Sequence, residues 1–344
     1  MCMSGDSVGE SAYSIKINTW NHLVKICYLA DPKSAHCRAV DIDSAFVATN
    51  YEEAGNDDLN DENDDQALMR FEFLEILCRV AIMKYGMGEA THDAAEALEM
   101  MLSNDVIPGL PPECFMDPDL FRRERLYCKA TAHVLEEHER LLQACYDFFK
   151  AADAVELMGM EHWLKFTDAA GLTSAVTRSS MREAKLIFGW SQMRVVNEIK
   201  NRHRVYSMTY IDFLEAVGRM ADLISPPTKE ELAAFFAPEG PTTDTPTWEY
   251  FQTVSVDEAE LKCHESAEFG AAPTVPLHVK LAQICEVIQA QLMQKWDART
   301  PTALVKQLDI MTVTVGGRKK APARKASILN VFDIMRTGKD ASSG

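Results

Sequence analysis

The sequence predicts an all-α protein in which two related helical modules are joined by a long helix and followed by a C-terminal helix. Apolar residues recur at helical spacing along most of the 344 residues. Strand-like alternation of apolar and polar residues is confined to one short stretch, DIMTVTVGG at 309–317. A phrase that opens such a helical pattern occurs twice, which predicts an internal duplication.

The duplicated phrase is LMRFEFLEILCRVAIMKYG in the first copy, starting at Leu68, and MTYIDFLEAVGRMAD in the second, starting at Met208. The identical pairs are Phe73 with Phe213, Leu74 with Leu214, Glu75 with Glu215, Arg79 with Arg219 and Ala81 with Ala221. Earlier parts repeat in the same order, since Trp20 and Trp163 lead the first helices and Phe46 matches Phe188 in the second. Each module therefore reads as helix, loop, helix, long loop and helix.

The helices follow from periodicity and from their start and stop signals. In the first module they are expected at 20–30, at 40–50 and from 68 onward, and a further helix follows at 91–102. The prolines of IPGLPPE (107–113) break the pattern and form a stiff, extended turn. Asp117 or Asp119 then opens a long helix to Ala152. The second module repeats the series at 158–169, 179–192, 195–200 and 208–223, and Thr228 caps a further short helix.

These elements divide the chain into a first module at 14–90, a helical connector at 91–152, a second module at 153–236, a loop or linker at 237–274, a C-terminal helix at 275–308 and a basic tail at 309–344. The linker is rich in Pro, Gly and Thr. The C-terminal helix is amphipathic from Val275 to Trp296. Its apolar side fits either a groove of the second module or a partner protein, and the sequence leaves this open.

Composition excludes several classes of function. The net charge of −17 disfavours non-specific binding to nucleic acid or to an anionic membrane, because both need a basic face. No apolar run reaches the length of a membrane span, and the N-terminus lacks the pattern of a signal peptide. The nine cysteines form no CxxC pair, which is typical of reduced thiols in the cytoplasm. We therefore expect neither nucleic acid nor membrane as a partner.

The phrase resembles the second half of an EF-hand pair, the helix–loop–helix unit of the calmodulin superfamily. In an EF-hand the eighth loop residue is apolar and pairs with the sister loop in a small β-bridge, and the twelfth is an acidic ligand that opens the exiting helix. Leu68 and Met208 match the eighth position, and Glu72 and Asp212 match the twelfth. The resemblance implies two EF-hand-like modules.

The calcium ligands of such a loop are incomplete in both copies. In the first, Asp61, Asn63 and Asp65 suit positions one, three and five, but Gln66 replaces the glycine of the sharp turn. In the second, Asn201, His203 and Val205 take those positions, and valine offers no side-chain oxygen. We expect degenerate modules and assign no metal ligand. The alternative is one weak divalent-cation site at 61–72.

The modules, at 18–86 and 156–224, also resemble the EF-hand-like module of the p25-alpha family of tubulin-associated proteins. The segment VIPGLPPECFMDPDLFRRERLYCKATAHVLEEHERLL resembles a stretch, at 91–150 here, of proteins from flagellated protists that carry these modules. This resemblance implies a cytoplasmic, cytoskeletal protein of the flagellar axoneme. Tubulin or other axonemal proteins are the partners it implies, within a larger assembly.

No constellation predicts catalysis or a cofactor. His133 and His138 are five residues apart and lie on different faces of a helix, unlike the HExxH zinc motif. GMGEAT (86–91) and GGRKKAP (316–322) lack the spacing of nucleotide-binding loops. The basic stretches FRRERLY (121–127) and RKKAPARK (318–325) are expected on a solvated face, or docked on an acidic surface such as a microtubule.

Aromatic and methionine side chains concentrate in the second module. Two interpretations fit them: a packed core, which is usual for apolar stripes of helices, or a groove that accepts a partner helix. The residues are Leu157, Met158, Met160, Trp163, Phe166, Phe188, Trp190 and Met193. We expect a non-enzymatic structural or adaptor protein that uses two calcium-independent modules as docking surfaces. The alternative function is a calcium-responsive regulator that binds the ion at 61–72.

Overall fold

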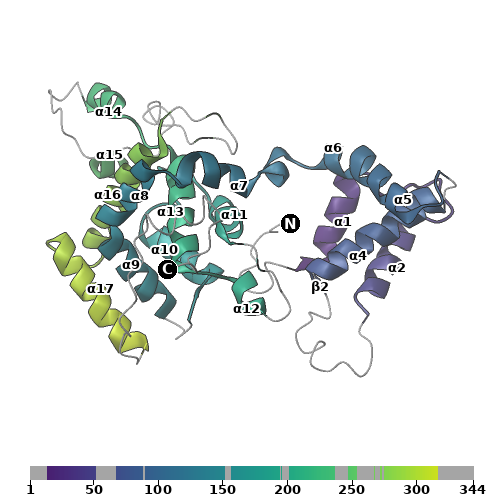
Figure 1. The fold of residues 1–344 in the computed structure, drawn as a ribbon, viewed down its shortest axis with the longest axis horizontal. Helices are drawn as coiled ribbons and strands as arrows, with labels where there is room; N and C mark the ends of the chain where they lie inside the picture. The colour runs from purple at the N-terminus through teal and green to yellow at the C-terminus, as the bar shows by residue number, and fades with distance from the viewer. Residues whose placement is uncertain are drawn as a thin grey trace, which may run out of the picture. The chain divides into compact units, whose positions relative to one another are not determined.

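The computed structural model describes residues 14–51, 67–87, 90–151, 156–193, 195, 201–236, 247–253, 267, 272 and 275–316. The chain divides into two compact units, residues 1–115 and 116–344 (Figure 1). Within the described residues both units are built of helices, and strands occur only as short antiparallel pairs, which confirms the all-α prediction. No helix in these ranges has the length and apolar content to cross a membrane.

The first unit contains a two-stranded sheet and the helices around it. Its elements are β1 (Ile15–Lys16), α1 (Ile17–Ile26), α2 (Ala39–Thr49), β2 (Ala67–Leu68), α4 (Arg70–Ala81), the π-helical turn η2 (Ile82–Gly86), α5 (Ala94–Met101), the π-helical turn η3 (Leu102–Val106), α6 (Ile107–Gly109) and the 3₁₀ turn η4 (Pro112–Phe115). Trp20, Phe46, Ile76 and Met101 are buried in one apolar core. The acidic loop at 52–66 lies outside the described residues.

The proline segment at 107–113 is more helical than the extended turn expected from its sequence. Residues 107–109 form α6, and 112–115 form η4, and Leu110 between them is extended. Gly109 allows this segment to approach the end of α1, because a Cβ there would lie 2.8 Å from the carbonyl oxygen of Ile26. The boundary between the two units falls inside the expected connector at 91–152: residues 91–115 belong to the first unit and residues 116–152 to the second.

The second unit surrounds a similar small sheet with more helices. Its elements are α7 (Pro118–Phe121), the π-helical turn η5 (Arg122–Leu126), α8 (Lys129–Glu137), α9 (Glu139–Ala151), β3 (Met158–Gly159), α10 (Met160–Ala169), α11 (Met181–Ser191), α12 (Arg202–Val205), β4 (Ser207–Met208), α13 (Tyr210–Ile224), α14 (Lys229–Phe236), α15 (Thr247–Thr253), α16 (Leu277–Lys295) and α17 (Pro301–Gly316). Met158, Trp163, Phe188 and Phe213 are fully buried. The aromatic and methionine residues of the second module are thus largely core.

The duplication read from the sequence extends to the packing inside each unit. Ile15 pairs with Leu68 in the first sheet and Met158 pairs with Met208 in the second, which confirms the β-bridges expected at Leu68 and Met208. The ring of Trp20 meets that of Phe73 edge-on, with centroids 6.3 Å apart. The equivalent pair, Trp163 and Phe213, meets in the same way at 6.0 Å.

The long helix predicted up to Ala152 is broken into four pieces, α7, η5, α8 and α9. The backbone leaves the helical region at Tyr127 and is extended at Cys128, where α8 begins. The hydroxyl of Thr131 donates to the carbonyl oxygen of Arg125 at 3.2 Å, across this break. Local side-chain bonds of this kind compete with the helix ladder, so the periodicity continues while the helix does not.

The C-terminal helix consists of two helices, α16 and α17. The apolar face of α16 is buried within its own unit against α8, α13 and α15, which settles the open choice in favour of intramolecular packing. Residues 309–316, which alternate like a strand and begin the expected basic tail at 309–344, instead continue α17 to Gly316. Helix α17 lies along α9 (Figure 1) and buries Leu304 and Leu308. The expected linker contains α15, whose Tyr250 is fully buried.

Candidate functional site

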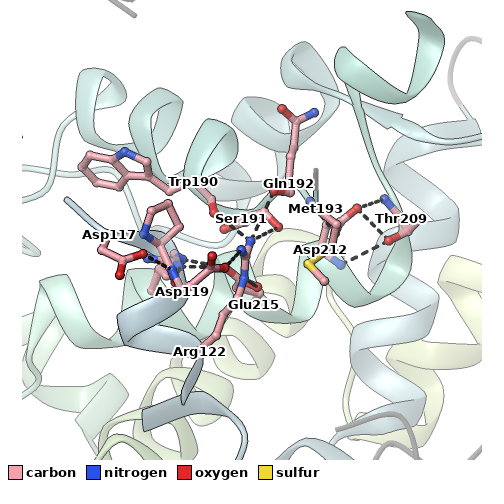
Figure 2. Close-up of polar contacts among 12 residues, drawn as sticks. Asp117, Asp119, Arg122, Trp190, Ser191, Gln192, Met193, Thr209, Asp212 and Glu215 are labelled. Carbon is pink, nitrogen blue, oxygen red and sulfur yellow. Dashed lines mark hydrogen bonds and ion pairs between the residues drawn. The ribbon is translucent and has the colours of Figure 1, made fainter. Parts of the chain in front are cut away.

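A cluster of buried charged side chains lies on one face of α13 (Figure 2). The carboxylate of Glu215 accepts hydrogen bonds from Arg122 Nε at 2.8 Å and from Arg219 Nε at 2.9 Å. The side chains of Arg122, Glu215 and Arg219 are 7%, 2% and 4% exposed. Arg122 also bonds Asp119 Oδ1 at 2.7 Å through Nη1. Two guanidinium groups therefore share one buried carboxylate.

The side chain of Arg122 also caps the C-terminal end of helix α11. Its Nη2 donates to the carbonyl oxygens of Trp190, Ser191 and Gln192, at 3.0, 3.3 and 3.2 Å (Figure 2). The last carbonyls of a helix have no intrahelical partner and carry partial negative charge, so a guanidinium satisfies both requirements. One side chain from the start of the second unit therefore links α11 to α13.

Residues 118–126, here called the Arg122 segment, contact Glu215, Gly218 and Arg219 of α13. We define the α13 face as these three residues together with the buried Leu214. The guanidinium carbon of Arg219 lies 4.3 Å from the ring centroid of Phe121, and its Nη2 donates to the carbonyl oxygen of Pro118 at 2.8 Å. A Cβ on Gly218 would lie 3.3 Å from Leu126 Cδ1. The glycine thus admits the leucine to close contact with the helix backbone.

Burial penalises the charged form of each group in this cluster, so each buried charge depends on its oppositely charged partners. Desolvation raises the pKa of Glu215 above its ordinary value and lowers the pKa of Arg219. Burial acts in the same direction on Arg122, but its bonds to Glu215 and Asp119 outweigh it and raise the pKa of this guanidinium. Burial also raises the pKa of nearby Tyr127 to about 12. The cluster can hold a helical segment in place, and its carboxylate is already engaged by two arginines.

A second carboxylate, Asp212, lies in the first turn of α13 and accepts hydrogen bonds from Thr209 and from Met193. Its Oδ2 accepts from Thr209 N at 2.8 Å and from Thr209 Oγ1 at 2.7 Å, and its Oδ1 accepts from Met193 N at 3.3 Å (Figure 2). Arg204 Nη1 lies 3.6 Å from Asp212 Oδ2. Glu72 caps α4 in the same way, since its Oε2 accepts from Met69 N at 2.7 Å.

Most of the residues weighed as calcium ligands can be placed. Asp61, Asn63 and Asp65 lie outside the described residues, whereas Glu72 lies buried at the first turn of α4. In the second module, Asn201 directly precedes α12, and the other loop positions lie within that helix. Among the described residues, no three His, Cys, Asp or Glu side chains gather closely enough to hold a metal ion.

The basic stretch at 121–127 is a solvated face only in part, since the side chain of Arg123 is 64% exposed while the other two arginines of the stretch are engaged within the second unit. Arg122 is buried on Glu215, and Arg125 pairs with Asp222 and donates to the carbonyl oxygen of Val275 at 3.2 Å. Lys280 Nζ bonds the other oxygen of Asp222 at 3.1 Å. The partners of these arginines lie far along the chain, so composition alone makes the stretch look unpaired. The tail stretch at 318–325 lies outside the described residues.

Sequence reasoning missed the cluster on α13, although a signal for it exists. Glu215 and Arg219 stand among apolar residues of the duplicated phrase, and α13 is apolar on almost every side. Charged residues are rarely buried without a partner, so their presence in such a helix predicts an additional charged segment.

The second unit also contains a pocket. It has a volume of about 630 Å³ and is lined by Trp248, Glu286, Gln289, Ala290, Met293, Gln294 and Pro301. Among the described residues of this lining, Glu286 is the one ionisable side chain.

Comparison of the chain with protein-family models, with curated proteins and with solved structures found no match.

Proposed function

We propose that this protein is a non-catalytic structural adaptor of the flagellar axoneme or a related microtubule cytoskeleton. It holds other proteins through two degenerate EF-hand-like modules that act without calcium. In the described residues of each unit, a short strand precedes two helices, and a second short strand, paired with the first, precedes a final helix; the second unit has the additional helix α12 before its second strand. This order supports an EF-hand-like origin, because the loops of an EF-hand pair meet in such a bridge.

Calcium independence is proposed because the two carboxylates at the twelfth loop position already cap helices. Asp212 and Glu72 each accept the backbone N–H three residues earlier and so cap a helix. In the second module Arg204 brings a positive charge to within 3.6 Å of Asp212. A cationic side chain there opposes the binding of a divalent ion at the same carboxylate.

The Arg122 segment supports a role in holding helices. The second module receives this helical segment on its α13 face through buried charges and an arginine–aromatic contact. The resemblance of 18–86 and 156–224 to tubulin-associated modules, and of 91–150 to proteins of flagellated protists, points to the axoneme. Two modules in one chain allow it to bridge two neighbours or two repeats of a lattice.

A fractionation experiment tests this function. The tagged chain is expressed in a flagellated protist, the cells are extracted with detergent, and the axonemes are washed with buffered calcium or with a chelator. We expect the chain to stay with the axoneme under both conditions, and proximity labelling to mark axonemal neighbours. Recovery in the detergent-soluble fraction would refute the adaptor proposal, and calcium-dependent release would favour a regulator.

A further inference from the structure

The two copies of the duplicated phrase differ in what covers them. On α13, Leu214, Glu215, Gly218 and Arg219 are buried, and the last three contact the Arg122 segment. The aligned residues of α4 are exposed. We define the α4 face as Phe71, Leu74, Glu75, Cys78 and Arg79. Phe71 and Leu74 are 63% and 56% exposed, and the side chains of Glu75 and Arg79 are 48% and 46% exposed.

The α4 face has the chemistry of a binding surface. Phe71, Leu74 and Cys78 form an apolar stripe at helical spacing, with Ile82 at its end. Beside the stripe, Arg79 Nη2 pairs with Glu75 Oε1 at 2.6 Å, as Arg219 pairs with Glu215 on α13. Clustered apolar residues exposed beside such a charged pair mark interaction sites more often than bare surface.

We propose that the α4 face binds an amphipathic helical segment of a separate partner protein, which carries an acidic residue, an arginine three positions later and a bulky apolar residue just before the arginine. The Arg122 segment is the precedent, with Asp119, Phe121 and Arg122 in this order. Glu75 accepts the partner's arginine as Glu215 accepts Arg122. Arg79 packs on the partner's bulky residue, which is aromatic where the contact matches that of Arg219 on Phe121.

One difference between the faces sets the specificity. Gly218 lets Leu126 approach the helix closely, whereas α4 has Cys78 at the aligned position. The Cβ and Sγ of the cysteine occupy the space that the leucine side chain needs. A partner segment therefore carries a residue as small as alanine at this point, four positions after its arginine.

This inference rests on the proposed adaptor function, since it names the partner chemistry of the first module. Its test uses purified full-length protein and a labelled peptide of residues 116–128 with Leu126→Ala and Cys128→Ser. We expect saturable binding by fluorescence anisotropy, weakened about tenfold or more by Arg122→Met in the peptide or by Glu75→Gln in the protein. Glu99→Gln, which removes an equal charge from an exposed site of α5, leaves binding unchanged.

Several outcomes would overturn the proposal. Absence of binding at millimolar peptide would do so, and so would equal affinity for the Glu75→Gln and Glu99→Gln proteins. If sedimentation shows dimers of the protein and Glu75→Gln dissociates them, the α4 face binds a second copy of the chain instead of a separate partner. Asp333 and Arg336 are spaced like Asp119 and Arg122, so tighter peptide binding by Arg336→Met protein would make the chain's own end the occupant. Failure of the peptide leaves axonemal association intact, which separates this inference from the proposed function.

Discussion

Replacing Glu215 by glutamine tests the buried cluster, and Glu75 provides a matched control at the aligned position of the other module. Both residues follow a phenylalanine and a leucine, and both pair with an arginine four residues later. Glutamine keeps the size of the side chain and removes only the charge. The two variants therefore compare one change in two environments.

The expected magnitudes follow from burial. In Glu215→Gln the guanidiniums of Arg122 and Arg219 lose their shared anion while both side chains stay buried. Arg122 keeps Asp119, whereas Arg219 keeps the carbonyl oxygen of Pro118 and the ring of Phe121, neither of which carries a charge. Breaking one side of a buried ion pair costs about 3–5 kcal/mol, so we expect a loss of at least ~3 kcal/mol. The half-exposed pair of Glu75 is worth about 0.3–0.5 kcal/mol.

Urea unfolding followed by circular dichroism and tryptophan fluorescence measures both free energies. The curves are fitted with separate transitions, because a chain with two compact units need not unfold in one step. Four of the five tryptophans lie in the second unit, so fluorescence reports mainly on the transition that Glu215→Gln shifts. A loss below ~1 kcal/mol for Glu215→Gln, or equal losses for both variants, would refute the reasoning from burial.

Two further predictions follow from packing and from buried thiols. Gly218→Leu should displace the Arg122 segment and cost about 1–3 kcal/mol, whereas Cys78→Leu on exposed α4 should change the free energy of unfolding by less than ~0.5 kcal/mol; equal effects in denaturant titrations would contradict this. Burial raises the pKa of Cys285 to about 12, from 9.0, and also raises the pKa of Cys145. Because the thiols ionise at lower pH in the unfolded chain than in the folded one, the free energy of unfolding should fall as pH rises from 9 toward 12. Cys285→Ala should make that fall less steep. The same dependence of the urea midpoint on pH in the variant and in the original protein would contradict this prediction.

Local patterns in the sequence were sufficient for most helices and for the duplication. Periodicity located the helices, and the repeated phrase placed Leu68 and Met208 at the paired strands. The alignment also matched Trp20 with Trp163 and Phe73 with Phe213, and the structure adds that the tryptophan and phenylalanine of each copy pack on each other. The helices and the matched residues depend on residues close in sequence or on matching positions of two copies, so they can be recognised without a structure.

The remaining features depend on contacts between distant residues. Arg122 and Glu215 are 93 positions apart, so a basic stretch gave no sign that its charge is neutralised inside the unit. The alternating Thr and Val residues after Asp309 suggested a strand, but Leu304 and Leu308 bury one side of α17. The hydroxyls of Thr312 and Thr314 donate to carbonyl oxygens four residues earlier, which accommodates them within that helix.

Calcium titration of the purified protein by calorimetry, with magnesium as competitor, tests most directly whether the modules act through their surfaces or through an ion. We expect no binding heat at millimolar calcium, because Glu72 and Asp212 already cap helices and Arg204 stands beside Asp212. A stoichiometry near one with a dissociation constant below about 10 µM, abolished by Glu72→Gln, would place a sensor-type site at 61–72. That result would contradict calcium-independent docking and make the protein a calcium-responsive regulator.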